Sequence, residues 1–338
     1  MNGPGGTGVG DTVLDVVDLS VFYNTNHVVS HVVKNVNFSL ARKQTLAIVG
    51  ESGSGKSSMA MAIARLLPES ARVAGRVELN GRNLLEQSAR ALEDIRGSEI
   101  AVIFQNPMTS LNPTMRVGQQ IAEQVLRHRT QSRAVARRRA AELLEAVMIR
   151  NPADVYRKFP HELSGGMKQR VMIAMAVSCE PKVLIADEPT TALDVTVQAE
   201  ILQILRLLSR DQNMGLLLIT HNMGIVAEMA TDVAVIYDGR MAEYASVEDL
   251  FREPLHPYTR GLLDARPRID DAEARTRRLS TISRPAPKLD GVVEGYRLSE
   301  GTGTDADTAA GRPGEVPGQR FISIGDDLVP VVRESVTT

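Results

Sequence analysis

The chain has 338 residues, of which 43% are hydrophobic, and its formal net charge is −2 at pH 7. A chain of this length and composition can bury one large domain with an appendage, and it lacks the basic excess that would favour nucleic acid as the main ligand. No apolar run approaches the roughly 18 residues that cross a bilayer, and the glycine-rich N-terminus lacks a secretion-signal pattern, so we expect a soluble, cytoplasmic chain.

Cys179 is the single cysteine of the sequence. One cysteine excludes an internal disulfide and any metal or cluster site made of cysteines alone within one chain. We interpret Cys179 as a small buried residue at the end of a helix.

Two strands are predicted near the N-terminus. Residues 12–23 alternate apolar and polar side chains, and a second strand is expected over residues 36–40 after a loop over residues 24–33. Tyr23 ends the first strand. Its ring could stack on the face of an adenine base, or it could be an ordinary strand-end tyrosine.

A glycine-rich loop between a strand and a helix is the strongest signal in the sequence. Residues 46–49 predict a buried strand, residues 59–67 predict a helix, and residues 50–57 match the phosphate-loop pattern Gly-x-x-x-x-Gly-Lys-Ser. Glycines let backbone N–H groups approach phosphate oxygens, and the helix adds the positive end of its dipole. We expect Lys56 to reach the β- and γ-phosphates and the Ser57 hydroxyl to bind Mg²⁺. The predicted nucleotide-binding residues here are Gly50, Ser52, Gly53, Ser54, Gly55, Lys56, Ser57 and Ser58.

Two further strands are expected before the character of the chain changes. Residues 75–79 predict a strand that ends in a tight Asn-Gly turn, and residues 100–105 predict an apolar strand that ends at Gln105. A polar residue at the carboxyl end of a buried strand lies where α/β proteins bind ligands. Taken alone, this segment favours a turn or capping role for Gln105.

Residues 117–147 are predicted to be largely helical and are rich in arginine. A run this basic would suit nucleic acid, but the intervening alanines and leucines predict an amphipathic helix, so we interpret the arginines as its solvated face. The arginines are Arg127, Arg129, Arg133, Arg137, Arg138 and Arg139. We expect a helical subdomain, at about residues 107–160, inserted into an α/β core.

A second candidate anion site lies at Ser164, Gly165 and Gly166, which open an apolar helix. One ATP molecule has no obvious use for two such sites in the same chain. The need is met if a second subunit places its serine-glycine loop over the ATP of the first.

Two acids and a histidine end two more apolar strands. Residues 183–186 lead into Asp187 and Glu188, and residues 216–220 lead into His221. Because successive strand side chains point to opposite faces, we expect different roles for the two acids. Asp187 suits coordination of Mg²⁺ beside Ser57, and Glu188 suits polarisation of the water that attacks the γ-phosphate. We expect His221 and the other polar strand ends to meet at one edge of the sheet.

In order and spacing, these motifs resemble those of the ATP-binding subunits of ABC transporters, over about residues 13–267. The matching segments are Gly50 to Ser57, Gln105, Leu163 to Met167, Asp187 with Glu188, Ala192 to Asp194, and His221. The resemblance implies an α/β phosphate-loop NTPase fold of the ABC type, with an antiparallel β subdomain, an inserted helical subdomain and a small C-terminal extension. We expect the ATP-binding domain over residues 11–265 and the extension over residues 266–338.

Three segments resemble more narrowly the oligopeptide, dipeptide and nickel importers. They are residues 104–113 (FQNPMTSLNP), 191–198 (TALDVTVQ) and 256–259 (HPYT). The resemblance implies an ATPase that powers import of di- or oligopeptides. Nickel or another solute stays open as an alternative, because these residues do not distinguish the solutes.

The resemblance also implies individual roles around ATP and Mg²⁺. Tyr23 would stack on adenine, and His221 would contact the γ-phosphate beside the catalytic Glu188. Gln105 would sense the nucleotide, signal to membrane subunits and join Ser57 and Asp187 near the metal.

A dimer of ATP-binding subunits is implied as the working unit. Ser164, Gly165 and Gly166 would contact the γ-phosphate held by the partner, and Asp194 would bridge the two subunits. ATP would close the dimer, hydrolysis would reopen it, and two membrane permeases would couple that motion to import.

Further partners follow from the same resemblance. The second ATP-binding subunit would commonly be a paralogue, and an extracytoplasmic solute-binding protein would act indirectly. The chain would lie peripherally on the cytoplasmic face of the cell membrane and would bind no nucleic acid.

The C-terminal tail departs from the subfamily pattern. Many members carry spaced cysteines there, and some tails hold an iron–sulfur cluster, but this chain has Tyr296, Thr302 and Thr308 near the expected positions. No such cluster is therefore expected. Residues 291–318 are expected to be mobile, whereas residues 321–332 predict a short strand or two in a small terminal domain.

A soluble ABC ATPase that acts on DNA or ribosomes is the alternative of a different class. DNA-repair members carry long coiled-coil insertions or zinc-binding cysteines, and ribosome-acting members usually carry two cassettes in one chain. The sequence has neither feature. An exporter is disfavoured by the importer segments and by the absence of fused membrane spans.

Overall fold

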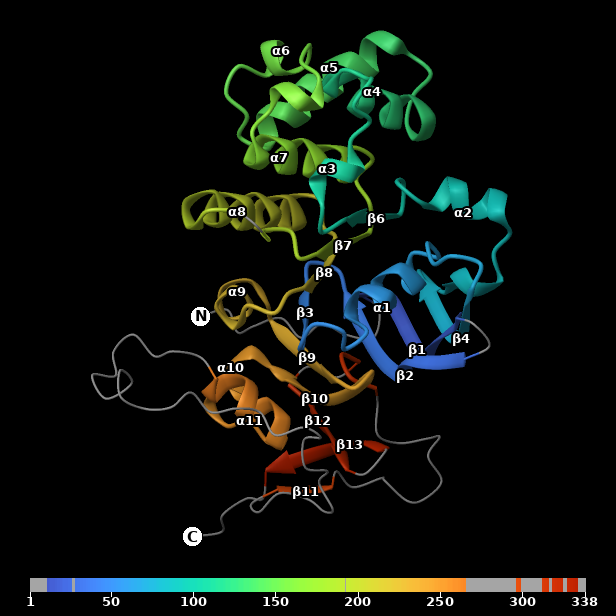
Figure 1. Cartoon of the computed structure of the whole chain (residues 1–338), viewed down its shortest axis with the longest axis vertical. Coiled ribbons are helices and arrows are strands. Elements are labelled where there is room, and N and C mark those ends of the chain that lie inside the picture. The colour runs from blue at the N-terminus through green and yellow to red at the C-terminus, as the bar shows by residue number, and fades with distance from the viewer. Residues whose placement is uncertain are drawn as a thin grey trace, which may run out of the picture.

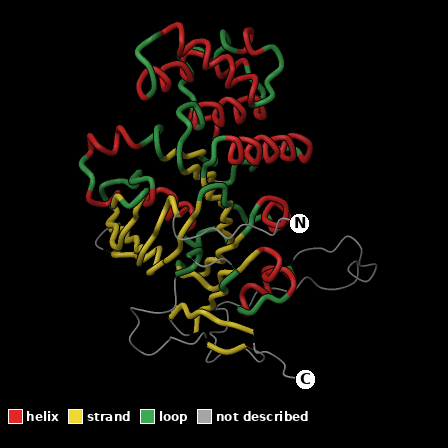
Figure 2. The backbone as a smooth tube through the Cα atoms, turned by 180° about the vertical axis from the view of Figure 1, so that it is seen from behind, coloured by secondary structure: helices red, strands yellow, loops and turns green. Residues whose placement is uncertain are grey.

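A computed structural model of the chain describes residues 11–25, 28–191, 193–265, 296–298, 312–315, 318–324 and 327–333. A lobe of helices lies at one end, two sheets lie in the middle, and a short set of antiparallel strands lies at the other end (Figure 1). The view from behind shows the same lobe of helices at one end, with further helices beside the strands (Figure 2).

In the described part of the chain, five parallel strands form one side of the larger, nine-stranded sheet. Their order is β9 (Asp232–Tyr237), β3 (Thr45–Val49), β8 (Gly215–Ile219), β7 (Val183–Asp187) and, at the edge of the sheet, β6 (Ile100–Ile103). Every residue of β3, β7 and β8 is buried. Near-continuous apolar strands of this kind belong to parallel sheets that are covered on both faces. The carboxyl ends of these strands therefore meet along one edge.

The smaller sheet is antiparallel and has the order β2 (Val28–Ala41), β1 (Thr12–Thr25), β4 (Ala71–Leu79) and β5 (Arg82–Asn83). The prediction of a loop over residues 24–33 is wrong. Strands β1 and β2 pair as far as Thr25 opposite Val28, so only residues 26 and 27 separate them. The valines at the start of β2 are β-branched and favour the extended conformation, which explains the longer hairpin.

The phosphate-loop helix, α1 (Lys56–Ile63), begins and ends earlier than the predicted 59–67. It begins at the loop lysine, directly after Gly55, which has a φ of 98°. It ends before Arg65, whose φ of 58° is left-handed and cannot continue an α-helix. The short helices η2 (Leu84–Glu86) and α2 (Ala89–Ile95) then lead to β6.

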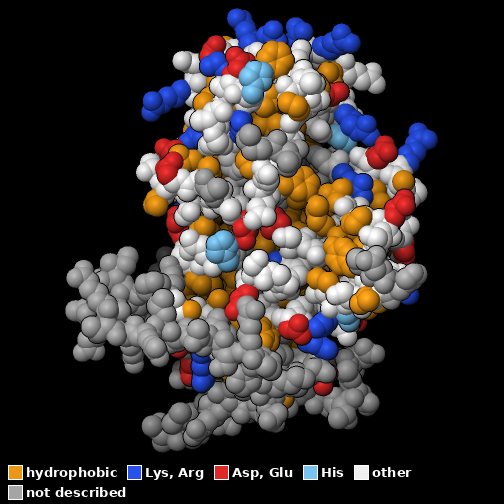
Figure 3. Space-filling view, in the orientation of Figure 1, with side chains coloured by type: hydrophobic (Ala, Val, Ile, Leu, Met, Phe, Trp, Pro, Cys, Tyr) orange, Lys and Arg blue, Asp and Glu red, His pale blue; other side chains and the backbone are white. Residues whose placement is uncertain are grey.

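The helical lobe contains the arginine-rich segment. Its helices are α3 (Pro107–Ser110), α4 (Val117–His128), α5 (Arg133–Ala146), α6 (Pro152–Val155), η3 (Pro160–Glu162) and α7 (Gly165–Ala176). Lys and Arg side chains gather at the outer end of the lobe (Figure 3). Most of the arginines of this segment are exposed, whereas Ala136, Ala140, Leu143 and Leu144 are buried. This pattern agrees with a solvated basic face on an amphipathic helix.

Helices α8 (Val195–Asp211) and α9 (Met223–Met229) belong to the α/β core. Cys179 is buried just after the end of α7, as predicted. No helix in the described part of the chain is long and apolar enough to cross a membrane.

The C-terminal strands continue the central sheet. From β9 the order runs through β10 (Arg240–Ser246), β12 (Arg320–Ile324), β13 (Asp327–Arg333) and β11 (Tyr296–Leu298), with antiparallel pairing throughout. The strands predicted over residues 321–332 are therefore confirmed. Helices α10 (Val247–Arg252) and α11 (Pro257–Asp264) lie between β10 and the tail. Most of the tail expected to be mobile, residues 291–318, lies outside the described residues.

The two sheets share a core. Phe38 on β2 is 0% exposed and belongs to the same buried cluster as Leu46 and Ile48 on β3 and Met59 on α1. This packing holds the hairpin of β1 and β2 against the strand and helix that flank the phosphate loop.

We expect Phe38→Ala to lower the free energy of unfolding by about 3–5 kcal/mol, because it leaves a cavity at this junction. Val29→Ala is the control, since Val29 is 65% exposed and should change stability by less than about 0.5 kcal/mol. Urea unfolding of the two variants measures the difference. Equal midpoints would show that the sheets do not depend on this contact.

Candidate functional site

The phosphate loop leaves β3 through a close backbone approach. A Cβ atom at Gly50 would lie 2.2 Å from the carbonyl oxygen of Ile236, and one at Gly55 would lie 2.6 Å from that of Val32. Both glycines also have positive φ, 153° and 98°. Only glycine fits either position, so the loop runs close to β9 on one side and to β2 on the other.

Lys56 is held inside its own loop. Its Nζ donates hydrogen bonds to the carbonyl oxygens of Gly50 at 2.8 Å and Glu51 at 2.6 Å, and it lies 3.3 Å from Oγ of Ser54. Burial lowers the pKa of Lys56, and the negative charges of Glu188 and Asp187 act in the opposite direction. An ammonium group forms stronger hydrogen bonds with anionic oxygens than with carbonyl oxygens, so Lys56 can exchange these loop contacts for those of an anionic ligand.

The tip of the loop is open. Ser52, Gly53 and Ser57 are exposed, whereas Ser54, Gly55 and Lys56 are buried. Backbone N–H groups at an exposed tip and a buried lysine beneath it form a phosphate cradle at the start of a helix.

Asp187 lies beside the loop at the end of β7. Burial raises its pKa, a hydrogen bond from Ser57 lowers it, and the charge of Glu188 raises it further. Oδ1 of Asp187 is buried and has no hydrogen-bond partner among the described residues. An oxygen donor of this kind next to a serine hydroxyl fits Mg²⁺, which keeps waters and phosphate oxygens in its coordination shell. No group of three His, Cys, Asp or Glu side chains in the described part of the chain could hold a metal on its own.

Glu188 lies at the centre of the sheet edge where the polar residues that follow β6, β7 and β8 meet. Nε2 of Gln105 donates to its Oε2 at 3.0 Å, Oγ1 of Thr191 donates to the same oxygen at 2.8 Å, and Nδ1 of His221 lies 3.0 Å from its Oε1. The expected meeting of the polar strand ends is therefore confirmed. Thr191 was not predicted, although a threonine three residues after a strand-end acid could have suggested it.

The side chains of Asp187 and Glu188 have different surroundings because of a turn, not because side chains alternate along a strand. Strand β7 ends at Asp187, and Glu188 has a left-handed φ of 47°. The alternation used to assign them different roles therefore does not extend to Glu188. The left-handed backbone directs its carboxylate to Gln105 and His221 instead, and such a conformation costs on the order of 1 kcal/mol for a non-glycine residue.

Hydrogen bonds keep Glu188 ionised. Burial raises its pKa, but hydrogen bonds from His221 and Thr191, the charge of His221 and that of Lys56 together bring the pKa below its ordinary value. The carboxylate can therefore accept a hydrogen bond from a water molecule at neutral pH.

Tyr23 reaches the phosphate loop from β1. Its hydroxyl donates to Oγ of Ser58 at 3.2 Å, directly after the loop. The contact places the Tyr23 hydroxyl beside the first turn of α1.

The serine-glycine segment lies in the helical lobe, apart from α1 (Figure 1). Ser164 caps α7 by accepting a hydrogen bond from the N–H of Met167, and Ser164 and Gly165 are exposed. A Cβ atom at Gly166 would lie 2.7 Å from the side chain of Val197 on α8. Sequence reasoning therefore predicted two anion sites, and a single chain does not bring them together.

Asp194 caps the neighbouring helix. Its Oδ1 accepts a 2.9 Å hydrogen bond from the N–H of Val197 at the start of α8. Asp194 is exposed and is followed by Val195, which is 81% exposed. Ala192, which completes the Ala-Leu-Asp segment, lies outside the described residues.

Comparisons with known proteins agree with this geometry. The family model "ABC transporter" matches residues 33–191, and "Oligopeptide/dipeptide transporter, C-terminal region" matches residues 242–295. A probable peptide ABC transporter ATP-binding protein, y4tR of Sinorhizobium fredii, is 47% identical over 86% of this chain and 87% of its own length. The chain is an ABC transporter ATP-binding subunit. ATP is thus its nucleotide, and hydrolysis of ATP is its reaction.

Two further relatives of this ABC subunit are also named as peptide transport ATP-binding proteins. The oligopeptide transport ATP-binding protein OppD of Escherichia coli is 47% identical over 82% of each chain, and the dipeptide transport protein DppD of Bacillus subtilis is 47% identical over 77% of this chain and 78% of its own. Among solved structures, the ATP-binding cassette MJ0796 in a dimeric post-hydrolysis state bound to ADP and Pi superposes with a TM-score of 0.62 at 25% identity. It covers 69% of this chain and 98% of its own. None of these proteins supports an ATPase that acts on DNA or ribosomes.

Glu188→Gln should keep ATP binding and lower the rate of phosphate release by about 10²-fold or more, as expected for a lost general base. A malachite-green assay at saturating ATP measures the rate. Glu145→Gln is the control, because Glu145 is exposed on α5. Near-normal turnover in the Glu188 variant would remove Glu188 from the role of base.

Lys56→Ala should weaken ATP binding by about 1.5–3 kcal/mol, because a charge-assisted contact to phosphate disappears. Isothermal titration calorimetry with ATP and Mg²⁺ measures the affinity. The control is Lys182→Ala, because Lys182 is exposed and precedes β7, at the opposite end of that strand from Asp187. Unchanged affinity would contradict the assignment of Lys56.

Proposed function

We propose that this ABC subunit hydrolyses ATP to power the import of di- or oligopeptides across the cytoplasmic membrane. The observation that carries the proposal is the 47% identity to a probable peptide transporter subunit over 86% of this chain. The match of residues 242–295 to the oligopeptide/dipeptide transporter C-terminal region supports the same solute class. Nickel import has no comparable support among the relatives named above.

Nucleotide binding follows from the phosphate loop. The backbone N–H groups of the exposed tip and the ammonium of Lys56 would hold the β- and γ-phosphates, and Tyr23 would stack on the adenine base. Ser57 and Asp187 would hold Mg²⁺, with Gln105 approaching it once nucleotide is bound. When bound, Mg²⁺ neutralises charge on the β- and γ-phosphates.

Hydrolysis would use Glu188, the acid just after the end of β7. Glu188 would orient and polarise the attacking water, and His221 would hold the carboxylate while contacting the γ-phosphate. The lowered pKa of Glu188 makes it a weak base. A weak base can serve here, because in the loose transition state of phosphoryl transfer the orientation of the attacking water matters more than its deprotonation.

A dimer would supply the second anion site. Ser164, Gly165 and Gly166 are apart from the phosphate loop of their own chain, and the exposed N-terminus of α7 would bind the γ-phosphate held by a partner subunit. Asp194 and the exposed Val195 beside it would contact the partner. ATP would then close the dimer and hydrolysis would release it.

Two membrane permeases would receive this motion. Gln105, bonded to Glu188, begins the segment 105–112, which leads into the helical lobe at about residues 107–160. The segment 105–112 and the part of the lobe up to about residue 160 would dock on the permeases at the cytoplasmic face of the membrane. We further propose a paralogous ATP-binding subunit as a direct partner and an extracytoplasmic solute-binding protein as an indirect one.

Peptide uptake in the native host tests the proposal. A strain that carries Glu188→Gln should lose import of labelled di- and oligopeptides and keep import of a labelled amino acid, which is the control solute. The ATP-trapped variant should co-purify from detergent with two multi-span permeases and a second ATP-binding chain. Normal peptide uptake would overturn the peptide assignment, and loss of nickel uptake instead would identify another solute.

A further inference from the structure

Tyr258 lies in the core against the phosphate loop, in a position that the roles above do not use. It belongs to α11, is 0% exposed and packs its ring on Tyr237 with 4.4 Å between ring centroids. Its hydroxyl oxygen accepts a 3.0 Å hydrogen bond from the backbone N–H of Glu51, 207 positions earlier in the chain. The C-terminal region thus touches the nucleotide loop directly.

This hydrogen bond holds a peptide group that also binds Lys56. The N–H of Glu51 and the carbonyl of Gly50 belong to one planar peptide unit, and they point in opposite directions. Tyr258 holds the N–H side, while the carbonyl of Gly50 accepts the Lys56 ammonium at 2.8 Å. Rotation of this unit would therefore move both contacts together.

The backbone that carries Tyr258 is itself anchored. Nδ1 of His256 caps α11 by accepting a 3.1 Å hydrogen bond from the N–H of Tyr258. Burial lowers the pKa of His256, which favours the neutral ring, and only the neutral ring can accept this hydrogen bond. The carboxylate of Glu243 on β10 is 0% exposed and accepts the N–H groups of Leu255 and His256, each at 3.0 Å. The start of α11 is thus fixed to the central sheet.

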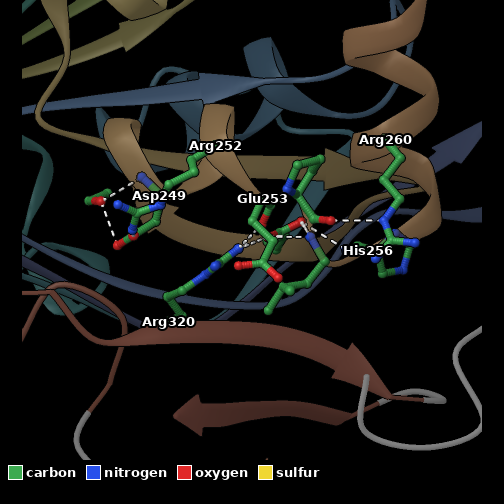
Figure 4. A network of polar contacts seen from close by, with 10 residues as sticks. Asp249, Arg252, Glu253, His256, Arg260 and Arg320 are labelled. Atoms are coloured by element: carbon green, nitrogen blue, oxygen red, sulfur yellow. Dashed lines mark hydrogen bonds and ion pairs between the residues drawn. The ribbon is translucent and has the colours of Figure 1, made fainter. Parts of the chain in front are cut away.

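A strand of the C-terminal extension completes the anchor. Arg320 reaches from β12 toward Glu253 and His256 (Figure 4). Its Nη2 donates to Oε1 of Glu243 at 2.8 Å and to the carbonyl oxygen of Glu253 at 2.7 Å. The Glu243 and Arg320 side chains are only 0% and 7% exposed. A buried carboxylate needs such a partner, so β12 stabilises the charge that holds α11.

We propose that Tyr258 is a positioning residue of the phosphate loop, through which the C-terminal strand β12, by Arg320 and Glu243, sets the affinity for ATP. The proposal rests on the nucleotide-binding part of the proposed function and is independent of the transported solute. It assigns to the His-Pro-Tyr-Thr segment a role in shaping the ATP site of its own chain.

Tyr258→Phe tests the contact, because it keeps the ring and removes only the hydroxyl. We expect the dissociation constant for a fluorescent ATP analogue to rise roughly 3- to 10-fold, the effect of one neutral hydrogen bond. KM for ATP should rise similarly while kcat changes little, since ground-state binding is lost. Tyr244→Phe is the matched control: Tyr244 on β10 is, like Tyr258, a buried tyrosine, it is 1% exposed, and its ring packs on Phe321.

Three outcomes separate the possibilities. A rise in KM for Tyr258→Phe alone, with similar melting temperatures for both variants, supports a positioning role. Equal KM values for wild type and Tyr258→Phe, or the same rise in both variants, overturn it. A wild-type chain that binds no ATP would instead overturn the proposed function.

Arg320→Gln tests the link to the C-terminal strand. This substitution should also weaken ATP binding, and its effect should shrink when it is combined with Tyr258→Phe, because both act through one network. Independent effects that multiply in the double variant, or no effect of Arg320→Gln on affinity, would overturn the part assigned to β12.

Discussion

A buried ammonium group is the constraint on which the site depends. Lys56 is enclosed by carbonyl oxygens of its own loop, and two acids at the end of β7 lie near enough to oppose the effect of burial on its pKa. Isolated, such a charge would be costly, so loop, strand and acids must be placed together. The close approaches at Gly50 and Gly55 make this placement possible, since a side chain at either position would push the loop away from β9 or β2.

The parallel strands bring the polar groups of the candidate site together from distant parts of the chain. Gln105, Asp187, Glu188 and His221 lie at or just after the ends of three different strands, and the register of β6, β7 and β8 puts those ends at one edge. The left-handed turn at Glu188 then divides the two acids, one toward Ser57 and the other toward His221. The two carboxylates therefore have separate surroundings, as the different roles proposed for them require.

The C-terminal region is part of the nucleotide-binding fold and not only an appendage to it. Strand β12 adds to the central sheet through β10, and the ion pair of Arg320 with Glu243 lies inside that junction. Because Tyr258 then contacts the phosphate loop, a residue far along the sequence becomes a neighbour of the reaction centre. Under the proposal above, Arg320 in the C-terminal extension acts on the phosphate loop through Glu243 and the segment that carries Tyr258.

The sequence by itself determined the elements whose signals are local. Apolar runs defined the buried strands, the spacing of Gly50, Gly55 and Lys56 defined the phosphate loop, and the motif order identified the family, because each depends on residues close together in the chain. The tertiary structure decided what depends on contacts between distant segments. It extended the hairpin into residues 28–33 and added Thr191 to the hydrogen-bond partners of Glu188. It also brought the Tyr258 hydroxyl into hydrogen-bond contact with the phosphate loop. A hydrogen bond between residues 207 positions apart has no periodicity or spacing that a sequence could display, and only the folded sheet brings its two ends within reach.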